Sequence, residues 1–338
     1  MNALPRISVV IPTYQRRDAV ERLLWALAGQ SLAPEAFEVV VVVDGSEDGT
    51  PELVEAFPAP YTLRVFCQTN QGRSCARNVG VSHAQGEIVV FLDDDMEPVP
   101  GCLEAHAFAH CGSLRVAVVG AAPVSLGPSS SPIQVYAGEL FNRYYGQFAD
   151  AGRRFDYLDF YSGNFSIRRC IHQEVGGFDE TFTTYGNEDT EFSLRLARLG
   201  VSLVYDPAAA ACQSCLKDFS SFAHDTIAMG STAVLLAVKH PGVWRNLKLG
   251  TFRQTPLMWR FVRAGLLTLG RLVPPTPEMV IRLAGTFTPR RPRWRNLYFK
   301  YVLDYCFWIG VRKVLVAHPN GPDPFCHEQT SNAPGVSD

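Results

Sequence analysis

The chain has 338 residues, of which 47% are hydrophobic and 19% charged, so it can bury a sizeable core, has room for about two domains and is not a disordered chain. The nine cysteines are scattered and odd in number, and Met1 leads directly toward a strand pattern. We therefore expect reduced thiols, no signal peptide and a cytoplasmic location. No apolar run reaches the roughly 18 uninterrupted residues that a membrane span needs.

Four apolar runs predict buried strands: residues 7–11 (ISVVI), 39–43 (VVVVV), 61–67 (YTLRVFC) and 88–92 (IVVFL). Helical patterns lie between them: one ends at Gly29, one covers about residues 52–56, and one holds Arg73, Arg77 and Asn78. Strands that alternate with helices indicate an α/β fold, with a mostly parallel sheet covered by helices on both faces. In such a sheet ligands bind beyond the carboxyl ends of the strands.

Polar residues follow the predicted strands at that edge. They are Thr13, Tyr14, Asp44, Ser46 and the run Asp93, Asp94 and Asp95. A nucleotide is the natural occupant of such a crevice. No G-x-G-x-x-G follows the first strand and no glycine-rich loop ends in Lys and Ser or Thr, which excludes a dinucleotide-binding fold and a P-loop enzyme. Phosphate charge would then be met by a metal and by Arg16, Arg73 or Arg77.

The three aspartates after residues 88–92 are the strongest candidates for metal binding. In an extended chain Asp93 and Asp95 point to one face and Asp94 to the other. Two carboxylates on one face repel each other unless a cation lies between them. Mg²⁺ or Mn²⁺ fits, because these ions take oxygen ligands and often use one or two carboxylates together with substrate phosphates. The alternative is that the aspartates only end a strand and cap a helix that begins near Pro98.

Several motifs, in a fixed order, carry a family resemblance. They are V-V-I-P-T-Y-Q-R, V-D-G-S, N-Q-G-R-S-C-A-R-N-V-G, F-L-D-D-D, and G-G-F-D-E followed by G-N-E-D-T-E-F-S-L-R. Between residue 7 and about residue 237, the chain resembles family-two glycosyltransferases with the GT-A fold. The resemblance implies transfer of a sugar from a nucleoside diphosphate, here a UDP-sugar, to a hydroxyl of a glycan, lipid-linked or small-molecule acceptor. It also implies inversion at the anomeric carbon, a divalent cation and no nucleic-acid partner.

The resemblance assigns roles by position. The residues implied at the nucleotide and donor are Pro12, Thr13, Tyr14, Arg16, Asp44, Ser46, Arg77, Asp93 and Asp94. Asp95, with Asp93, matches the metal-binding D-x-D, and Asp189 beside Glu188 matches the catalytic base. Gly163 and Asn164 match the segment that lines the donor sugar and the acceptor.

The candidate base has an alternative reading. Glu188 and Asp189 also suit the first turn of a helix, where acids favour the helix dipole. The two readings are compatible, because the first turn of a helix can hold a catalytic base in a fixed position.

One departure from the family concerns the metal. Many relatives carry a histidine ligand shortly after the proline that follows residues 201–205. Here Pro207 leads through four alanines to Cys212, Gln213 and Ser214. The metal would then rely on Asp95, phosphate and water.

The net charge of −2 conceals two regions of opposite sign. From Lys239 to Lys313 the chain carries 15 Lys or Arg against two acids, and the remainder carries 16 basic against 31 acidic residues. Aromatic residues are interspersed in the basic region: Trp244, Trp259, Trp294, Tyr298, Tyr301, Phe307 and Trp308. Such a region favours an anionic membrane surface as partner, with the protein peripheral on the cytoplasmic face. The alternative is that it packs on the acidic part of the chain, within one copy or across a homodimer.

The expected organisation has four parts. Residues 1–125 form the nucleotide-sugar-binding α/β half, and 126–237 the half of the same GT-A-like domain that carries the acceptor site and the base. Residues 238–318 form a basic, aromatic and mainly helical extension, and 319–338 a disordered tail.

Two other functions compete with sugar transfer. A sugar-nucleotide nucleotidyltransferase would carry a glycine-rich loop after the first strand, and residues 12–17 contain no glycine. A non-catalytic, membrane-associated adaptor on a transferase-like fold is the other, and the presence of both acidic motifs argues against it.

Overall fold

The computed structural model describes residues 7–112, 114–148, 155–214, 217–289 and 291–317. The chain divides into two compact units, Met1–Phe222 with Phe287–Phe299, and Ala223–Thr286 with Lys300–Asp338. The expected disordered tail, 319–338, lies outside the described residues. The expected four-part organisation stays a prediction.

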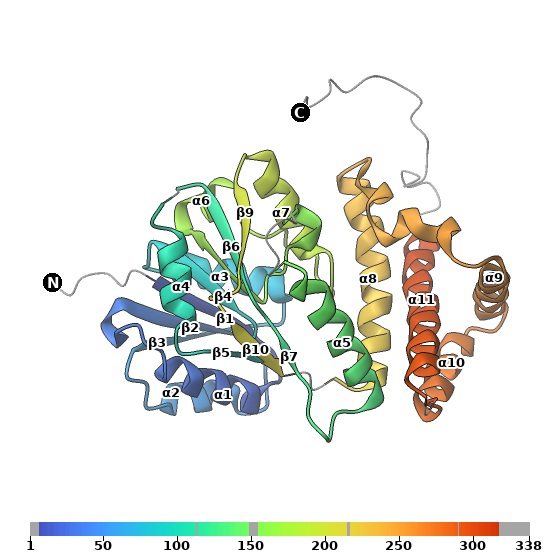
Figure 1. Cartoon of the computed structure of the whole chain (residues 1–338), viewed down its shortest axis with the longest axis horizontal. Coiled ribbons are helices and arrows are strands. Elements are labelled where there is room, and N and C mark those ends of the chain that lie inside the picture. Colours follow the sequence, from blue (N-terminus) through green and yellow to red (C-terminus); the bar gives the residue numbers. More distant parts are fainter. Residues whose placement is uncertain (1–6, 113, 149–154, 215–216, 290, 318–338) are drawn as a thin grey trace. The chain divides into compact units, whose positions relative to one another are not determined.

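The first unit is built on a seven-stranded sheet of order β3-β2-β1-β4-β8-β6-β9 (Figure 1). Its strands are β1 (Ile7–Thr13), β2 (Phe37–Asp44), β3 (Thr62–Gln68), β4 (Ile88–Leu92), β6 (Val116–Gly120), β8 (Asn164–Arg168) and β9 (Ser202–Asp206). Neighbouring strands pair in parallel except β8, which is antiparallel to β4 and β6. This confirms the mostly parallel sheet and all four predicted strands, whereas β6 and β8 were not predicted.

A smaller sheet of order β5-β10-β7 lies in the same unit. It consists of β5 (Met96–Pro98), β7 (Val124–Ser125) and β10 (Ala211–Ser214). Strand β5 follows the three aspartates directly, and its partner β10 carries Gln213 opposite Met96. The small sheet therefore brings residue 213 to the end of β4.

Each central strand contributes side chains to a core on either face of the sheet, which explains the uninterrupted apolar runs. In β4, Ile88, Val90 and Leu92 pack in one core, and Val89 and Phe91 pack in the other. Helices α1 (Arg17–Ala28), α2 (Thr50–Ala56) and α4 (Cys102–Ala109) contribute to the first core, and α3 (Arg73–His83), α6 (Arg169–Glu174) and α7 (Glu188–Arg198) to the second. The remaining helical elements of this unit are η1 (Pro34–Ala36), α5 (Pro132–Gly146) and η2 (Tyr157–Asp159). Helices thus cover both faces, as predicted.

The second unit is helical, as expected for the C-terminal region. It contains most of α8 (Phe219–Lys239) and α11 (Pro292–Ala317), with η3 (Val243–Arg245), η4 (Lys248–Gln254), α9 (Leu257–Leu272) and α10 (Thr276–Thr286). Helices α8 and α11 touch backbone to backbone at two glycines: a Cβ on Gly230 would lie 2.0 Å from the carbonyl oxygen of Phe307, and one on Gly310 would lie 1.8 Å from that of Ile227. Any larger residue at either glycine would force the two helices apart.

Within the described residues, α8 alone is long and apolar enough to cross a membrane, judged by length and composition. In its most apolar window 39% of the residues are buried. A helix in the core of a water-soluble protein passes the same test, so this finding is weak evidence of a span.

A buried ion pair lies at the centre of the second unit. Arg263 donates to Asp304 at 2.7 Å, and Trp259 Nε1 donates to the same carboxylate at 2.8 Å. The Arg263 guanidinium also lies against the rings of Phe252 and Trp308, 4.5 and 4.9 Å from the two ring centroids. Trp259, Phe307 and Trp308 therefore belong to the interior of this unit and do not form the expected exposed aromatic surface.

Candidate active site

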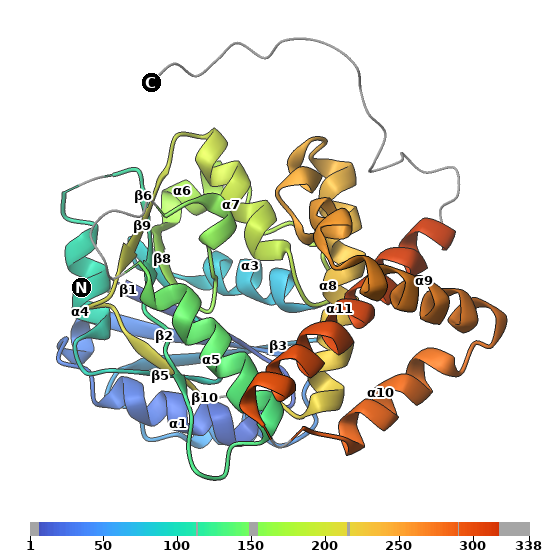
Figure 2. The same cartoon turned by 45° about the vertical axis from the view of Figure 1, so that its right-hand side comes forward.

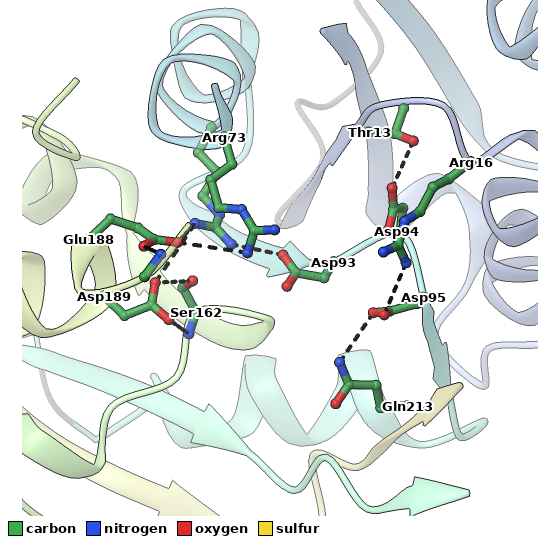
Figure 3. Close-up of polar contacts among 12 residues, drawn as sticks. Thr13, Arg16, Arg73, Asp93, Asp94, Asp95, Ser162, Glu188, Asp189 and Gln213 are labelled. Carbon is green, nitrogen blue, oxygen red and sulfur yellow. Dashed lines mark hydrogen bonds and ion pairs between the residues drawn. The ribbon is translucent and has the colours of Figure 1, made fainter. Parts of the chain in front are cut away.

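The predicted polar residues gather at one edge of the large sheet. Strands β1, β2 and β4 end there in Thr13, Asp44 and Leu92. Strand β8 runs the other way, so its first residue, Asn164, lies at the same edge and pairs with Leu92. Helix α7 begins nearby with Glu188 and Asp189 (Figure 3). The crevice expected at the carboxyl ends of parallel strands is therefore the place where the acidic motifs meet.

The arrangement of the three aspartates differs from the prediction. Asp93 faces Arg77. Asp94 and Asp95 instead both lie beside Arg16 (Figure 3). The expectation that Asp93 and Asp95 share a face opposite Asp94 was wrong. The reason is that β4 ends at Leu92 and the backbone N–H of Met96 donates to the carbonyl of Asp93 at 3.1 Å, so the aspartates form a turn in which strand alternation no longer applies.

Asp94 and Asp95 lie on the Arg16 side of the crevice. Thr13 donates its hydroxyl to Asp94 at 2.9 Å, and Arg16 lies 3.5 Å from Asp94 and donates to Asp95 at 3.2 Å. On the opposite side of Asp95, the Gln213 amide donates at 3.4 Å. Asp95 is thus held between a cation from the start of α1 and a neutral amide from β10.

Burial and the charges of neighbouring aspartates raise the pKa of both carboxylates. Burial raises the pKa of Asp94 to about 7, with Arg16 opposing the shift and Asp95 adding to it. Burial and the charge of Asp93 also raise the pKa of Asp95. A bound cation would relieve this repulsion.

Arg77 joins the two halves of the site. It is fully buried on α3, donates to Asp93 at 2.8 Å, and lies 3.7 Å from Glu188 and 3.8 Å from Asp189. Burial opposes ionisation of Asp93, but the charges of Arg77 and Arg73 lower its pKa. Since one guanidinium faces all three carboxylates, it fixes the position of the strand-end acid relative to the acids of α7.

Asp189 is held through both of its carboxylate oxygens. Ser162 donates both its hydroxyl and, at 3.3 Å, its backbone N–H to this carboxylate. Burial and the charge of Glu188 raise the pKa of Asp189 to about 6, although Arg77 and Ser162 oppose the shift. A carboxylate with such a pKa is ionised at neutral pH and is a stronger base than an exposed aspartate.

We expect Arg77→Met to lower the free energy of unfolding by about 3 kcal/mol, since it leaves Asp93 and the two α7 acids without their common counterion. Arg73→Met is the matched control, because Arg73 lies on the same helix, has a side chain that is 37% exposed and is 3.7 Å from Glu188. Its loss should change stability by about 1 kcal/mol or less. Urea unfolding measures both variants, and equal effects would show that Arg77 has no special part in holding the site.

The expected nucleoside pocket lies at the ends of β1 and β2. Pro12 is buried in the sheet, and Tyr14 is exposed beyond it. Ser46 accepts the backbone N–H of Gln15 at 2.8 Å, so the two strand ends are tied together. Asp44 is buried and accepts hydrogen bonds from the Gln68 amide and from the backbone of Gln71 and Gly72.

Asp44 can still take part in ligand binding. An ionised carboxylate has about four acceptor positions, and three are used here, so one is left for a base or ribose. The hydrogen bond from Gly72 to Asp44 depends on glycine at this position, since its φ of +90° is a conformation that other residues rarely adopt.

The residues at the end of β4 fit a hard divalent cation. The carboxylate of Asp95 adjoins the side-chain amide of Gln213, whereas Asp93 faces Arg77. In the described part of the chain no group of three or more His, Cys, Asp or Glu could hold a metal. An ion held at Asp95 would therefore take most of its other ligands from phosphate and water.

Comparison of the sequence with models of known protein families identifies the family of this chain. The model described as glycosyl transferase family 2 matches residues 8–176, half of the chain. The chain belongs to glycosyl transferase family 2. A second model, described as N-terminal domain of galactosyltransferase, matches residues 142–219, which include Asp189.

Curated relatives of this family 2 protein are named glycosyltransferases. Validoxylamine A glucosyltransferase of Streptomyces hygroscopicus subsp. limoneus is 31% identical over 224 residues, which cover 59% of this chain and 49% of the relative. Pre-mycofactocin glycosyltransferase of Mycobacterium tuberculosis is 28% identical over 238 residues, 70% of this chain and 48% of the relative. The chain spans about half the length of the curated relatives it matches.

Solved structures show the same GT-A-like fold. Mannosyltransferase PcManGT from Pyrobaculum calidifontis, in complex with GDP-Man and Mn²⁺, has a TM-score of 0.61 and 21% identity, and the match covers 92% of this chain and 88% of that one. S. aureus TarS 1-349, in complex with UDP-GlcNAc, has a TM-score of 0.52 and 17% identity, with 90% of each chain covered. At these identities the likeness concerns the fold.

Two predicted site residues of this family 2 protein lie beneath the crevice. Asn164 is fully buried, accepts a hydrogen bond from His106 Nε2 at its amide oxygen, and donates to the carbonyls of Ala121 and Ala209. Gly163 is also buried and accepts the backbone N–H of Asp93 at 3.0 Å. They therefore hold the backbone of the site and do not present a polar group to a sugar, because β8 is an interior strand of the sheet.

The structure also adds residues that the sequence reasoning passed over. Ser162 precedes Gly163 in the same motif, but only the fold brings its hydroxyl to Asp189. Tyr161 places its buried hydroxyl against Gly163, where a Cβ would lie 2.1 Å away, so a larger residue at this position would displace the Tyr161 ring.

Proposed function

We propose that this protein transfers a sugar from a nucleoside diphosphate, a UDP-sugar, to an acceptor hydroxyl, with inversion at the anomeric carbon and assistance from Mg²⁺ or Mn²⁺. The observation that supports the proposal is that one buried guanidinium, that of Arg77, contacts both Asp93 at the end of β4 and Asp189 at the start of α7. Inverting transfer needs a group on each side of the sugar, one at the leaving phosphate and one at the attacking hydroxyl.

Asp189 suits the role of base on the acceptor side. Ser162 donates its hydroxyl to one carboxylate oxygen and its backbone N–H, at 3.3 Å, to the other, and each oxygen keeps a second lone pair with which the carboxylate can accept the proton of an acceptor hydroxyl as it attacks. Glu188 is hydrogen-bonded to the backbone N–H of Gly186 at 2.9 Å and faces Arg73 and Arg77. Glu188 therefore supports the base electrostatically and does not take the proton itself.

Arg16 and Arg73 suit the donor side. Both are partly exposed at the crevice and lie beside the strand-end aspartates or the α7 acids, so each can turn toward a diphosphate. Asp95, with Asp93 and the Gln213 amide nearby, would hold the divalent cation. When bound, that ion neutralises charge that develops on the departing diphosphate.

A panel of nucleotide sugars tests the proposal. Each donor is added with Mg²⁺ or Mn²⁺, and binding is followed by thermal shift and by slow hydrolysis in the absence of acceptor. We expect one donor to raise the melting temperature in a metal-dependent way and to be hydrolysed slowly. If no donor binds and none turns over, the protein is not a sugar transferase, and the adaptor alternative takes its place.

We expect the transfer rate at saturating donor to rise with pH and to level off above about pH 6. The base works only as the carboxylate, and the pKa of Asp189 is raised to about 6, so below that value the rate should fall about tenfold per pH unit. A pH profile of kcat measures this limb. A rate that stays constant from pH 7 down to pH 4.5 would contradict an Asp189 with a raised pKa.

A further inference from the structure

The exposed side of helix α9 is apolar along its whole length. Its exposed large side chains are Leu257, Met258, Phe261, Val262, Leu269 and Leu272. At about 100° per residue they lie within a sector of about 140°. Met258, Phe261 and Leu272 are 79%, 71% and 72% exposed, so this side of the helix has no partner among the described residues.

The opposite side of α9 is the one that packs in the second unit. Arg263 is buried there against Asp304, and the carbonyl of Leu267 accepts a hydrogen bond from Arg312 of α11. The apolar surface is thus not a core surface that another part of this unit covers. The helix is oriented with its ion-paired side inward and its apolar side outward, the reverse of an ordinary surface helix.

Helix α10 also carries exposed apolar side chains. It follows α9 after a short turn, and a Cβ on Gly270 would lie 3.1 Å from Pro277, so the two helices approach closely at the turn and diverge beyond it (Figure 2). Met279 and Leu283, one turn apart on α10, are 56% and 66% exposed. We call the exposed apolar side chains of α9 together with these two the apolar hairpin surface. Exposed apolar surfaces of this size mark interaction sites.

The charges around the apolar hairpin surface are basic. Residues 257–272 contain no acid, and Arg260 and Arg271 border the apolar sector on one side. Arg282 on α10 is exposed. The two acids between Lys239 and Lys313 are both paired: Asp304 is buried with Arg263, and Glu278 lies 3.6 Å from His224 and 3.9 Å from Arg282.

We propose that the apolar hairpin surface inserts into the interfacial region of an anionic lipid bilayer and holds the protein there peripherally. Amphipathic helices bind in this way when the apolar side enters the acyl boundary and Arg side chains reach the headgroups. A second copy of the chain fits less well, because a two-fold contact through this surface would place its arginines against their own equivalents with no acid to pair. The inference does not depend on the transfer reaction.

Sedimentation of the full-length protein with vesicles tests the proposal. The vesicles are phosphatidylcholine alone or with increasing fractions of phosphatidylglycerol, at low and high salt. We expect the protein to sediment in proportion to the anionic lipid and to be released by salt. Changing Arg271 and Arg282 to Gln should weaken binding at low salt by about fivefold per residue.

The apolar contribution is tested by a matched pair of double variants. Met258→Ser with Phe261→Ser should weaken vesicle binding at least about tenfold. Phe108→Ser with Leu114→Ser removes two side chains that are equally exposed, 78% and 69%, in the first unit, and should bind vesicles as the wild type does. Circular dichroism and nucleoside diphosphate binding confirm that both variants are folded.

Three outcomes would overturn the proposal. The wild type remains in the supernatant with every vesicle, the Met258/Phe261 variant sediments as the wild type does, or the protein is a dimer that this variant converts to a monomer while vesicles have no effect. The last result would assign the apolar hairpin surface to a second copy of the chain. None of these outcomes bears on donor binding, so failure here is distinguishable from failure of the proposed reaction.

Discussion

We expect Asp189→Asn to lower kcat by at least about a hundredfold while the donor binds with unchanged affinity. The substitution is nearly isosteric, and the amide oxygen can still accept the Ser162 backbone N–H. An amide cannot take a proton from the acceptor hydroxyl, so the loss falls on the chemical step. Steady-state kinetics with a real acceptor, combined with calorimetric titration of the donor, measures the two parts separately.

Glu188→Gln is the matched control, because it changes the adjacent carboxylate on the same helix turn. Since Glu188 raises the pKa of Asp189, its neutralisation should move the acid limb of the kcat profile to lower pH. Activity at neutral pH should fall much less than in Asp189→Asn. If Asp189→Asn stays within a few-fold of the wild type and Glu188→Gln does not, the roles of the two acids are reversed.

Asp95→Ala should lower the metal-dependent affinity for the nucleoside diphosphate at least about a hundredfold, since the charge of the ion is lost together with its ligand. The fold should persist. The raised pKa of Asp95 means that its ionised form disfavours the native state at neutral pH, so removal of the charge does not lower the free energy of unfolding. Calorimetric titration with and without Mn²⁺ measures the affinity, and urea unfolding the stability. Equal diphosphate affinity with and without Mn²⁺ in the wild type would remove the aspartate run from the mechanism.

Variants at Gln213 sharpen this experiment. The Gln213 amide adjoins Asp95 where many relatives are expected to carry a histidine. Gln213→His should increase Mn²⁺ affinity, because imidazole is a better ligand for transition metals than an amide, whereas Gln213→Ala should decrease it. If neither substitution changes Mn²⁺ affinity, Gln213 only supports the Asp95 carboxylate.

Local pattern was enough for the central strands and for the order of the acidic motifs. Strands buried on two faces need uninterrupted apolar runs, and the runs at residues 39–43 and 88–92 lie within β2 and β4. Strand β8 was not predicted because its sequence, NFSIR, alternates polar and apolar residues and so lacks an uninterrupted apolar run. Its polar Ser166 is accommodated in the interior by hydrogen bonds with His106 and His110. Its antiparallel direction is a property of the chain path and not of its composition.

The sequence by itself determined the four strands β1 to β4, which acids stand at their ends, and to which family the motifs point, because these features depend on neighbouring residues and regular spacing. The tertiary structure decided what those residues face. It brought Arg77 to Asp189, 112 positions away, and it turned Asp93 away from Asp95 by ending β4 at Leu92. It also decided that the apolar side of α9 faces outward. The hydropathy pattern of this helix does not tell which side is buried, and only the packing of Arg263 against Asp304 selects the inner side.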